Sequence, residues 1–170
     1  IILLVMNGCQ ARPPERSCAI EDLLLDQDDF PAGTILDPVN SPIADLPQES
    51  AGRTAGYNQD LIYVQVARYR SLKDAESKFD ELDRFLFAVD KYSGPWSVPE
   101  TIADFVLRAN RFRYACGRDS LGYGCRMVGQ YEEYIASLFA HVSNQGVTLD
   151  HFRTLMTILD SRMLQCLSEK

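Results

Sequence analysis

The sequence predicts a single α+β domain in which helices pack on an antiparallel β-sheet. Three observations favour this fold class. A strand-like run leads directly into an amphipathic helical pattern, two further strand-like runs are joined by a glycine-rich loop, and the C-terminal segment has helical periodicity. The chain has 170 residues, of which 46% are hydrophobic, enough for one core but few for two domains.

The N-terminal segment combines an apolar run with a cysteine. Residues 1–6 are apolar, but a membrane-spanning helix needs about 20 such residues. The stretch VMNGCQ resembles the lipobox of bacterial lipoproteins, in which a small residue precedes a cysteine that receives diacylglycerol. Gly8 and Cys9 match that pattern, whereas Met6 and Asn7 stand where the family prefers leucine and a small residue. The resemblance implies that residues 1–8 end a signal peptide.

We therefore expect three regions in the chain and a location at a membrane. Residues 1–8 end the signal peptide, residues 9–17 form the lipidated Cys9 and a polar tether, and residues 18–170 form one α+β extracytoplasmic domain. Each buried CH₂ of an acyl chain contributes about 0.8 kcal/mol, so lipid on Cys9 would anchor the domain to a membrane of the cell envelope. The alternative is a buried N-terminal strand followed by an ordinary Asn-Gly turn.

The number of cysteines agrees with this extracytoplasmic location. The chain has five cysteines, and lipidation of Cys9 leaves an even set, which suits an oxidising compartment. Cys116 and Cys125 flank the glycine-rich loop, so a hairpin would pair them. By elimination Cys18 then pairs with Cys166.

A metal site is the competing interpretation of the cysteines. It would use them together with His141 and His151 to hold zinc. Eight residues separate Cys116 from Cys125, not the two to four of common zinc knuckles. We expect no metal and no cofactor.

The first half of the domain has few regular patterns before residue 60. The stretch AIEDLLLDQDDFPAGT is a short apolar run followed by an acidic turn. Residues 35–57 are rich in proline, asparagine, serine and glycine, and Pro38, Pro42 and Pro47 oppose regular structure. We expect a long surface excursion there, serving either as a binding surface or as a passive connection.

The next two elements have clear patterns. LIYVQVARYR predicts a strand with Ile62, Val64 and Val66 on one face and tyrosines on the other. Ser71 is expected to cap a helix that ends before the Ser-Gly-Pro at 93–95. Its apolar stripe is Leu72, Ala75, Phe79, Leu82, Leu86 and Val89.

Two more strands and a helix complete the domain. We expect one strand from about Phe105 to Cys116, and a second, long strand within GCRMVGQYEEYIASLFAHVS, in which Gly129 marks a bulge or a close approach. Thr148 is expected to cap the last helix. Its buried stripe is Leu149, Phe152, Met156, Leu159, Met163 and Cys166.

A family resemblance rests on three parts of this sequence. LLLDQDDFPAG, the pair Cys116 and Cys125, and CRMVGQYEEYIASLF resemble the extracellular sensor-type domain of mycobacterial serine/threonine kinases and of related lipoproteins. The resemblance implies a disulfide-bonded α+β fold whose helices and sheet frame a cleft for a ligand.

Charge and motifs exclude several classes of function. With 17 basic and 24 acidic residues the net charge is −7, which opposes nucleic-acid binding, and we place Arg108, Arg111 and Arg113 on the solvated side of a strand. Neither G-x-S-x-G nor H-E-x-x-H occurs, and alternation would place Glu132 and Glu133 on opposite faces, where they cannot form a catalytic pair. We expect no enzymatic activity.

The favoured function is a membrane-anchored module that binds a small ligand or a protein partner. We expect a cleft between sheet and helices lined by Tyr63, Tyr69, Tyr131 and Tyr134, although tyrosines at such positions also serve as core and rim packing. The alternative is a structural accessory subunit of a larger envelope or membrane complex. A flat apolar patch would favour the subunit, and a deep pocket with converging polar groups would favour the binding module.

Replacing Cys9 tests the proposed anchor. Cys9→Ser removes the thiol that would accept lipid, so the protein should stay unprocessed or leave the membrane fraction. Membrane fractionation with mass measurement of the N-terminal peptide checks this. Unchanged membrane attachment of the variant would contradict the assignment.

Overall fold

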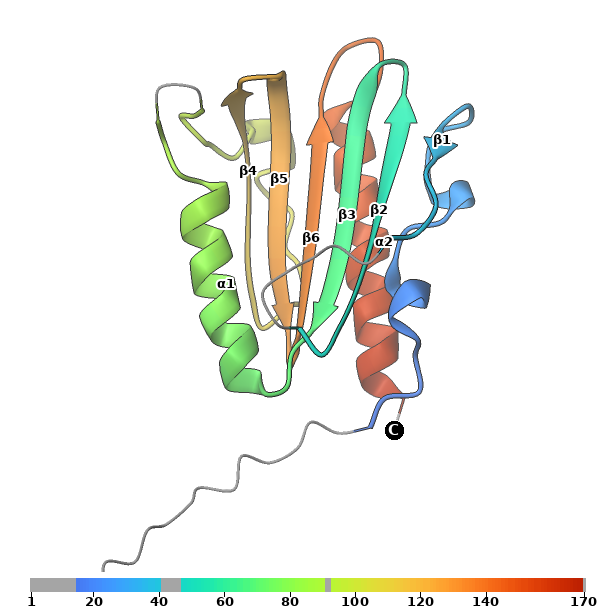
Figure 1. The fold of residues 1–170 in the computed structure, drawn as a ribbon. Helices are drawn as coiled ribbons and strands as arrows, with labels where there is room; N and C mark the ends of the chain where they lie inside the picture. Colours follow the sequence, from blue (N-terminus) through green and yellow to red (C-terminus); the bar gives the residue numbers. More distant parts are fainter. Residues whose placement is uncertain (1–14, 41–46, 91–92, 170) are drawn as a thin grey trace, which may run out of the picture.

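The described part of the chain folds around one antiparallel sheet. The computed structural model describes residues 15–40, 47–90 and 93–169. In these residues the sheet has six strands in the order β1-β2-β3-β6-β5-β4 (Figure 1). The strands are β1 (Ile35–Leu36), β2 (Glu49–Tyr57), β3 (Asp60–Arg68), β4 (Arg111–Asp119), β5 (Gly122–Tyr131) and β6 (Tyr134–His141). The predicted fold class, α+β with helices packed on an antiparallel sheet, is confirmed.

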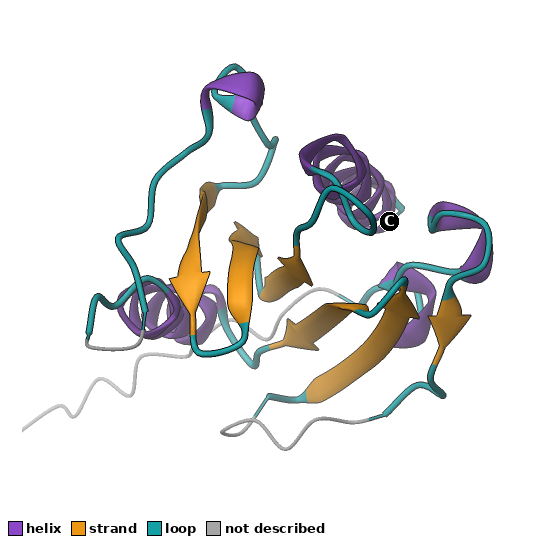
Figure 2. Cartoon of the chain, turned by 90° about the horizontal axis from the view of Figure 1, so that it is seen from above, coloured by secondary structure: helices purple, strands orange, loops and turns teal. Residues whose placement is uncertain are grey.

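The two long helices cover opposite faces of the sheet (Figure 2). Helix α1 (Leu72–Leu86) packs against β5 and β6, and α2 (Leu149–Ser168) packs on the other face, against the same two strands and the 3₁₀ helices η1 (Ile20–Leu23) and η3 (Glu100–Ile102). Each helix begins where predicted, because a side-chain oxygen of Ser71 or Thr148 accepts a backbone N–H three residues later.

The strand β2 corrects the prediction of a surface excursion over residues 35–57. Residues 49–57 pair with β3 along their whole length, and a two-residue turn with positive φ at Asn58 and Gln59 joins the strands. The fully buried inward side chains of β2 are Ala51 and Ala55, which are too small to give a strand-like pattern, and Tyr57 on the same face is half-buried. Residues 41–46, with Pro42, lie outside the described residues.

The predicted long strand around residue 130 is in fact two strands. Glu132 and Glu133 form a turn between β5 and β6, with a φ of 51° at Glu132, whose N–H donates to Asn110 Oδ1. Because the chain reverses, Tyr134 lies on the same face as Tyr131, whereas a continuous strand would have placed them on opposite faces. The sequence hides this turn because neither residue is glycine or asparagine.

The strand β4 begins later than predicted. It starts at Arg111 rather than near Phe105, and residues 103–110 connect it to η3. The Tyr114 hydroxyl donates to the Ile102 carbonyl at 2.7 Å and lies 3.0 Å from the Phe105 carbonyl oxygen, which holds this connection against the sheet. Aromatic residues there therefore pack without forming a strand.

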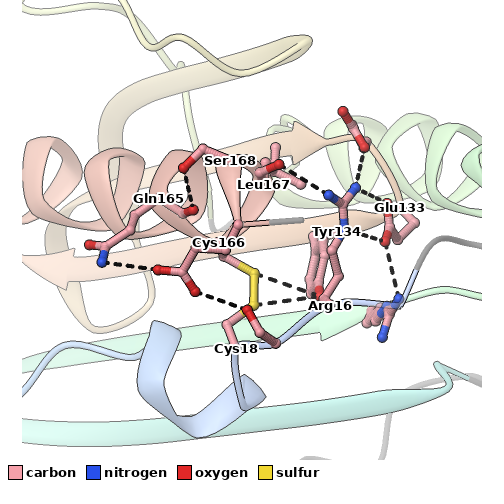
Figure 3. The surroundings of a disulfide bond; sticks show 12 residues. Arg16, Cys18, Glu133, Tyr134, Gln165, Cys166, Leu167 and Ser168 are labelled. Atoms are coloured by element: carbon pink, nitrogen blue, oxygen red, sulfur yellow. Dashed lines mark hydrogen bonds and ion pairs between the residues drawn. A yellow bond between two sulfur atoms is a disulfide. The ribbon is translucent and has the colours of Figure 1, made fainter.

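The predicted cysteine pairs are both present. Cys116 and Cys125 are directly opposite in the β4–β5 register, and the backbone of Cys116 bonds outward to Ser97, so the two cysteines form the non-hydrogen-bonded type of pair, whose Cα atoms lie closest. Cys18 joins Cys166, with 5.6 Å between their Cα atoms, and links the N-terminal segment to the end of α2 (Figure 3). Both cysteine pairs are therefore engaged in disulfides and offer no thiolates for zinc.

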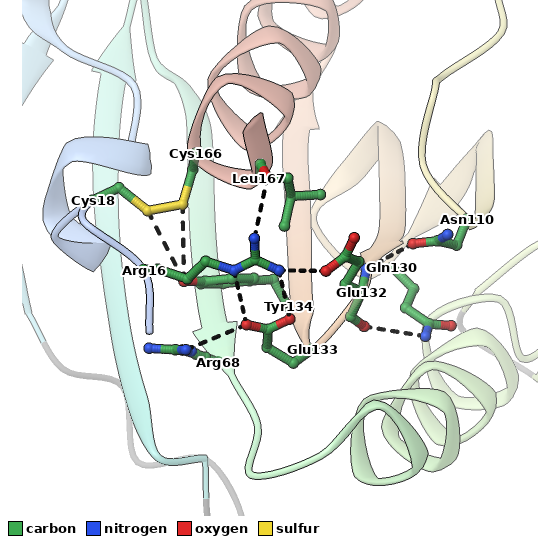
Figure 4. A network of polar contacts seen from close by, with 10 residues as sticks. All are labelled: Arg16, Cys18, Arg68, Asn110, Gln130, Glu132, Glu133, Tyr134, Cys166 and Leu167. Atoms are coloured by element: carbon green, nitrogen blue, oxygen red, sulfur yellow. Dashed lines mark hydrogen bonds and ion pairs between the residues drawn. A yellow bond between two sulfur atoms is a disulfide. The ribbon is translucent and has the colours of Figure 1, made fainter. Parts of the chain in front are cut away.

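An arginine before the first disulfide is also part of the folded domain. The Arg16 side chain is only 4% exposed, and its guanidinium contacts Glu132, Glu133 and the Leu167 carbonyl (Figure 4). Glu133 also pairs with Arg68 at 3.3 Å, so a buried carboxylate is shared between two arginines. The domain therefore extends to Arg16, inside the segment that we expected to be tether.

Removing each disulfide separately tests its contribution. On a loop-entropy model the 148-residue closure by Cys18 and Cys166 contributes about 5 kcal/mol and the nine-residue closure by Cys116 and Cys125 about 2.6 kcal/mol. The double Cys→Ala variant of the first pair should thus lower the free energy of unfolding more than that of the second. Urea unfolding of both variants measures this, and the reverse order would contradict it.

Candidate binding groove

A groove of about 920 Å³ lies between α1 and the uncovered part of the sheet. Its floor is formed by β3 and β6, one wall by the second half of α1, and one end by the β4–β5 turn. It exists because α1 packs on β5 and β6 and leaves the neighbouring face of β3 without a helix among the described residues. Its volume lies within the range typical of small-molecule sites.

Two cross-strand pairs form the centre of the floor. Tyr63 stands opposite Phe139, and Gln65 stands opposite Ser137. Their side chains point away from the main core because Ile62, Val64 and Val66 of β3 take the alternate positions, as predicted. The Tyr63 hydroxyl donates to Gln65 Oε1 at 3.4 Å, and burial raises the pKa of Tyr63 above its ordinary value.

The walls of the groove are mostly apolar. Leu82, Phe85 and Leu86 come from α1, Leu121 from the β4–β5 turn and Leu61 from the start of β3. Phe85 is 73% exposed and Leu121 74% exposed, so a large apolar surface remains accessible at the rim. Exposed apolar surface of this kind around a hollow is typical of a binding site.

Arg126 organises the end of the groove near the β4–β5 turn. Its guanidinium lies 4.3 Å from the Trp96 ring centre and 5.6 Å from that of Phe139. It donates to the Leu86 carbonyl at 2.7 Å and pairs with Asp119 at 3.1 Å. One side chain therefore ties the end of α1 to the sheet and to the turn.

The remaining charged side chains of the groove are also engaged. Lys78 pairs with Glu81 at 2.7 Å on α1, and Asp90 Oδ1 accepts the Ser93 N–H at 2.9 Å. Asp119 Oδ1 additionally accepts backbone N–H groups of the turn that it begins. Each charged side chain of the groove therefore already has a polar partner within the protein, and both cations are paired with carboxylates.

The four tyrosines predicted to line a cleft divide between the two faces. Tyr63 and Tyr69 line the groove, although Tyr69 is largely buried. Tyr131 and Tyr134 are 0% and 2% exposed and belong to the core under α2, so their predicted place in the cleft is wrong. The reversal at residues 132–133 accounts for Tyr134, which it places opposite Tyr131. Tyr131 precedes the turn and faces α2 by alternation along β5, together with the buried Cys125 and Met127.

Both misplaced tyrosines have structural contacts. The Tyr131 hydroxyl donates to Asp160 Oδ1 at 3.0 Å, and burial together with that carboxylate strongly raises the pKa of Tyr131. The Tyr134 hydroxyl lies 3.8 Å from Cys166 Sγ, and burial raises the pKa of Tyr134. These tyrosines hold α2 and its disulfide on the sheet.

The three arginines that we predicted to lie on a strand each pair with a carboxylate. Arg111 and Arg113 lie on β4, where they pair with Asp80 and Asp83 of α1 at 2.5 and 3.0 Å. Arg108 lies before β4 and donates to the buried Asp160 through its backbone N–H and its Nε. The predicted place on the solvated side of a strand is thus right only in part: Arg111 and Arg113 are exposed, but they lie on the face of β4 that is turned toward α1, and Arg108 lies outside the strand.

The histidines and the glutamate pair also have identifiable places. His141 ends β6 against the Phe139 ring, and the His151 backbone N–H donates to the N-cap Thr148. Glu132 and Glu133 both contact Arg16, and Glu133 also contacts Arg68, so two arginines balance the two carboxylates. The proposed lipidation site, Cys9, lies outside the described residues.

Most of the groove was not predicted from the sequence. Phe85 lies outside the apolar stripe of α1, and Arg126, Phe139, Gln65 and Ser137 carry no motif. The available signal was an aromatic residue on the polar side of a helix, since such a residue has no place in the helix–sheet contact. The polar residues of the floor become visible only once β3 and β6 are known to pair.

Arg126→Met tests the role of this arginine in shaping the groove. The variant removes the contacts to Leu86, Asp119 and Trp96, so the free energy of unfolding should fall by about 1.5–3 kcal/mol. Trp96 is the single tryptophan of the chain, so its emission spectrum should also shift. Arg118→Met, an exposed arginine on β4, is the control. Equal effects of both variants on stability and emission would contradict the assignment.

Comparisons with known proteins add no family to these observations. A scan against protein-family models and a search of the curated proteins both find no match to the chain. Among residues 15–40, 47–90 and 93–169, no helix has the length and apolar character needed to cross a bilayer.

Proposed function

We propose that this protein is a lipid-anchored binding module of the cell envelope whose ligand occupies the groove between α1 and the β3–β6 floor. The observation that carries the proposal is the groove, a hollow of about 920 Å³ with apolar walls and a few polar groups at its floor. This combination is typical of ligand sites, in which apolar contacts supply affinity and a few polar groups fix orientation.

The proposed compartment is supported by the disulfides. Two pairs of cysteines are joined, and disulfides persist outside the reducing cytosol. An anchor on Cys9 would leave a short connection to Arg16, the point at which the chain is held by Glu132 and Glu133. Lipid on Cys9 would therefore keep the domain close to the membrane surface.

Binding rather than catalysis is supported by the chemistry of the groove. Neither histidine of the chain lines it, and its lysine and arginine are each paired with a carboxylate. A general acid or base must instead be able to reach the reacting atoms and exchange a proton. The accessory subunit remains the alternative, but it would use a flat apolar patch rather than a hollow with Gln65 and Ser137 at its floor.

A neutral apolar fluorophore tests the groove directly. N-phenyl-1-naphthylamine should bind the wild-type protein, and Phe85→Asp should raise its dissociation constant at least about tenfold, because a carboxylate replaces exposed apolar surface at the rim. Val106→Asp is the matched control, since Val106 is 70% exposed and lies outside the groove. Circular dichroism should show both variants folded.

Two results would contradict the proposal. Failure of the wild-type protein to bind the fluorophore would show that the groove does not accept an apolar ligand. Equal binding by the wild type and Phe85→Asp would show that the fluorophore binds elsewhere.

A further inference from the structure

We infer that the ligand of this groove is an electrically neutral amphiphile, with an apolar body and one hydrogen-bonding head such as a carboxamide. The inference rests on the proposed function and adds to it the chemical class of the ligand. Two polar side chains on the floor of the groove have hydrogen-bonding atoms without a partner in the described structure. The charged side chains of the groove, in contrast, are already engaged by other groups of the protein.

The floor offers one polar position between apolar neighbours. Gln65 and Ser137 face each other across β3 and β6, with Tyr63–Phe139 on one side of them and Ala67–Ile135 on the other. Within the part of the chain that the structure describes, neither Gln65 Nε2 nor Ser137 Oγ has a hydrogen-bond partner. Both side chains are half-buried, so an apolar ligand covering them would remove their water without replacing it.

A ligand head group with both a hydrogen-bond donor and a hydrogen-bond acceptor would satisfy Gln65 and Ser137. The Gln65 amide nitrogen donates, and the Ser137 hydroxyl both donates and accepts. A carboxamide supplies a carbonyl oxygen for the first and an N–H for the second. A hydrocarbon supplies neither, so its binding would leave both groups unsatisfied.

An anionic head group of a ligand would find no cation in the groove that is not already engaged by a carboxylate. Arg126 is engaged by Asp119 and the Leu86 carbonyl, while the aromatic rings of Trp96 and Phe139 flank its guanidinium. Lys78 is engaged by Glu81. An anion would have to break one of these pairs, and burying an unpaired charge is costly.

A cation is disfavoured by the same pairing. The Asp119 side chain is 10% exposed and already binds Arg126 and two backbone N–H groups, and Asp90 accepts the Ser93 N–H. Glu81 is more exposed but belongs to the ion pair with Lys78 at the rim. A buried ammonium would therefore compete with existing partners rather than meet a free carboxylate.

Three ligands of one chain length separate the possibilities. Decanamide, decanoate and decylamine share the apolar body and differ in the charge of the head at neutral pH. Each is titrated, below its micelle concentration, against the bound N-phenyl-1-naphthylamine. Decanamide should displace the fluorophore at a concentration at least about tenfold lower than either charged ligand.

Substitutions on the groove floor test whether the head group of the ligand binds to Gln65 and Ser137. Gln65→Leu with Ser137→Ala should abolish most of the preference for decanamide while leaving the fluorophore bound. Gln145→Leu, an exposed glutamine after β6, is the control and should retain the preference. A preference that persists in the floor variant would overturn the inference.

The outcomes distinguish this inference from the proposed function. If a charged ligand displaces the fluorophore as well as decanamide does, while Phe85→Asp still weakens fluorophore binding, the ligand class is wrong and the groove remains the binding site. If the fluorophore is insensitive to Phe85→Asp, the proposed function fails and the ligand class fails with it.

Discussion

The width of the sheet relative to one helix determines the rest of the structure. Neighbouring strands lie about 4.8 Å apart and a helix with its side chains is about 10 Å wide, so one helix covers roughly two strands. On one face α2 is supplemented by η1, and Leu23, Leu24 and Leu25 complete the main core. On the other face α1 covers β5 and β6, and the hollow follows β3. The groove thus arises because α2 and η1 cover one face of the sheet more completely than α1 covers the other.

Elements defined by local signals were predictable from the sequence, whereas those defined by distant contacts were not. The strand β3 and both helices have side-chain periodicity, and the helices have serine or threonine caps, all within a few residues. The fully buried inward residues of strand β2 are only the small Ala51 and Ala55, so its pairing with β3 identifies it. The turn at Glu132 and Glu133 depends on Arg16, Arg68 and Asn110, which lie far away in the sequence.

The same difference explains the candidate site. Tyr63 was placed correctly because alternation along β3 assigns its face. Tyr134 was misplaced because one unrecognised turn changes the face of every residue that follows it. Tyr131 precedes that turn and belongs to the core face of β5 with Cys125 and Met127. Gln65 and Ser137 form a site only as a cross-strand pair, and a pairing register between segments so distant in the chain carries no local signal.

The disulfide between Cys18 and Cys166 makes the folded chain a covalent ring. A protease that cuts an exposed loop, such as the β4–β5 turn at Ser120 and Leu121, produces two fragments that cannot diffuse apart. The second disulfide bridges that same hairpin, so its strands stay joined beside the cut. A nicked molecule therefore keeps its fragments at a high effective concentration for each other. Cleavage of the backbone does not by itself release either piece of the domain.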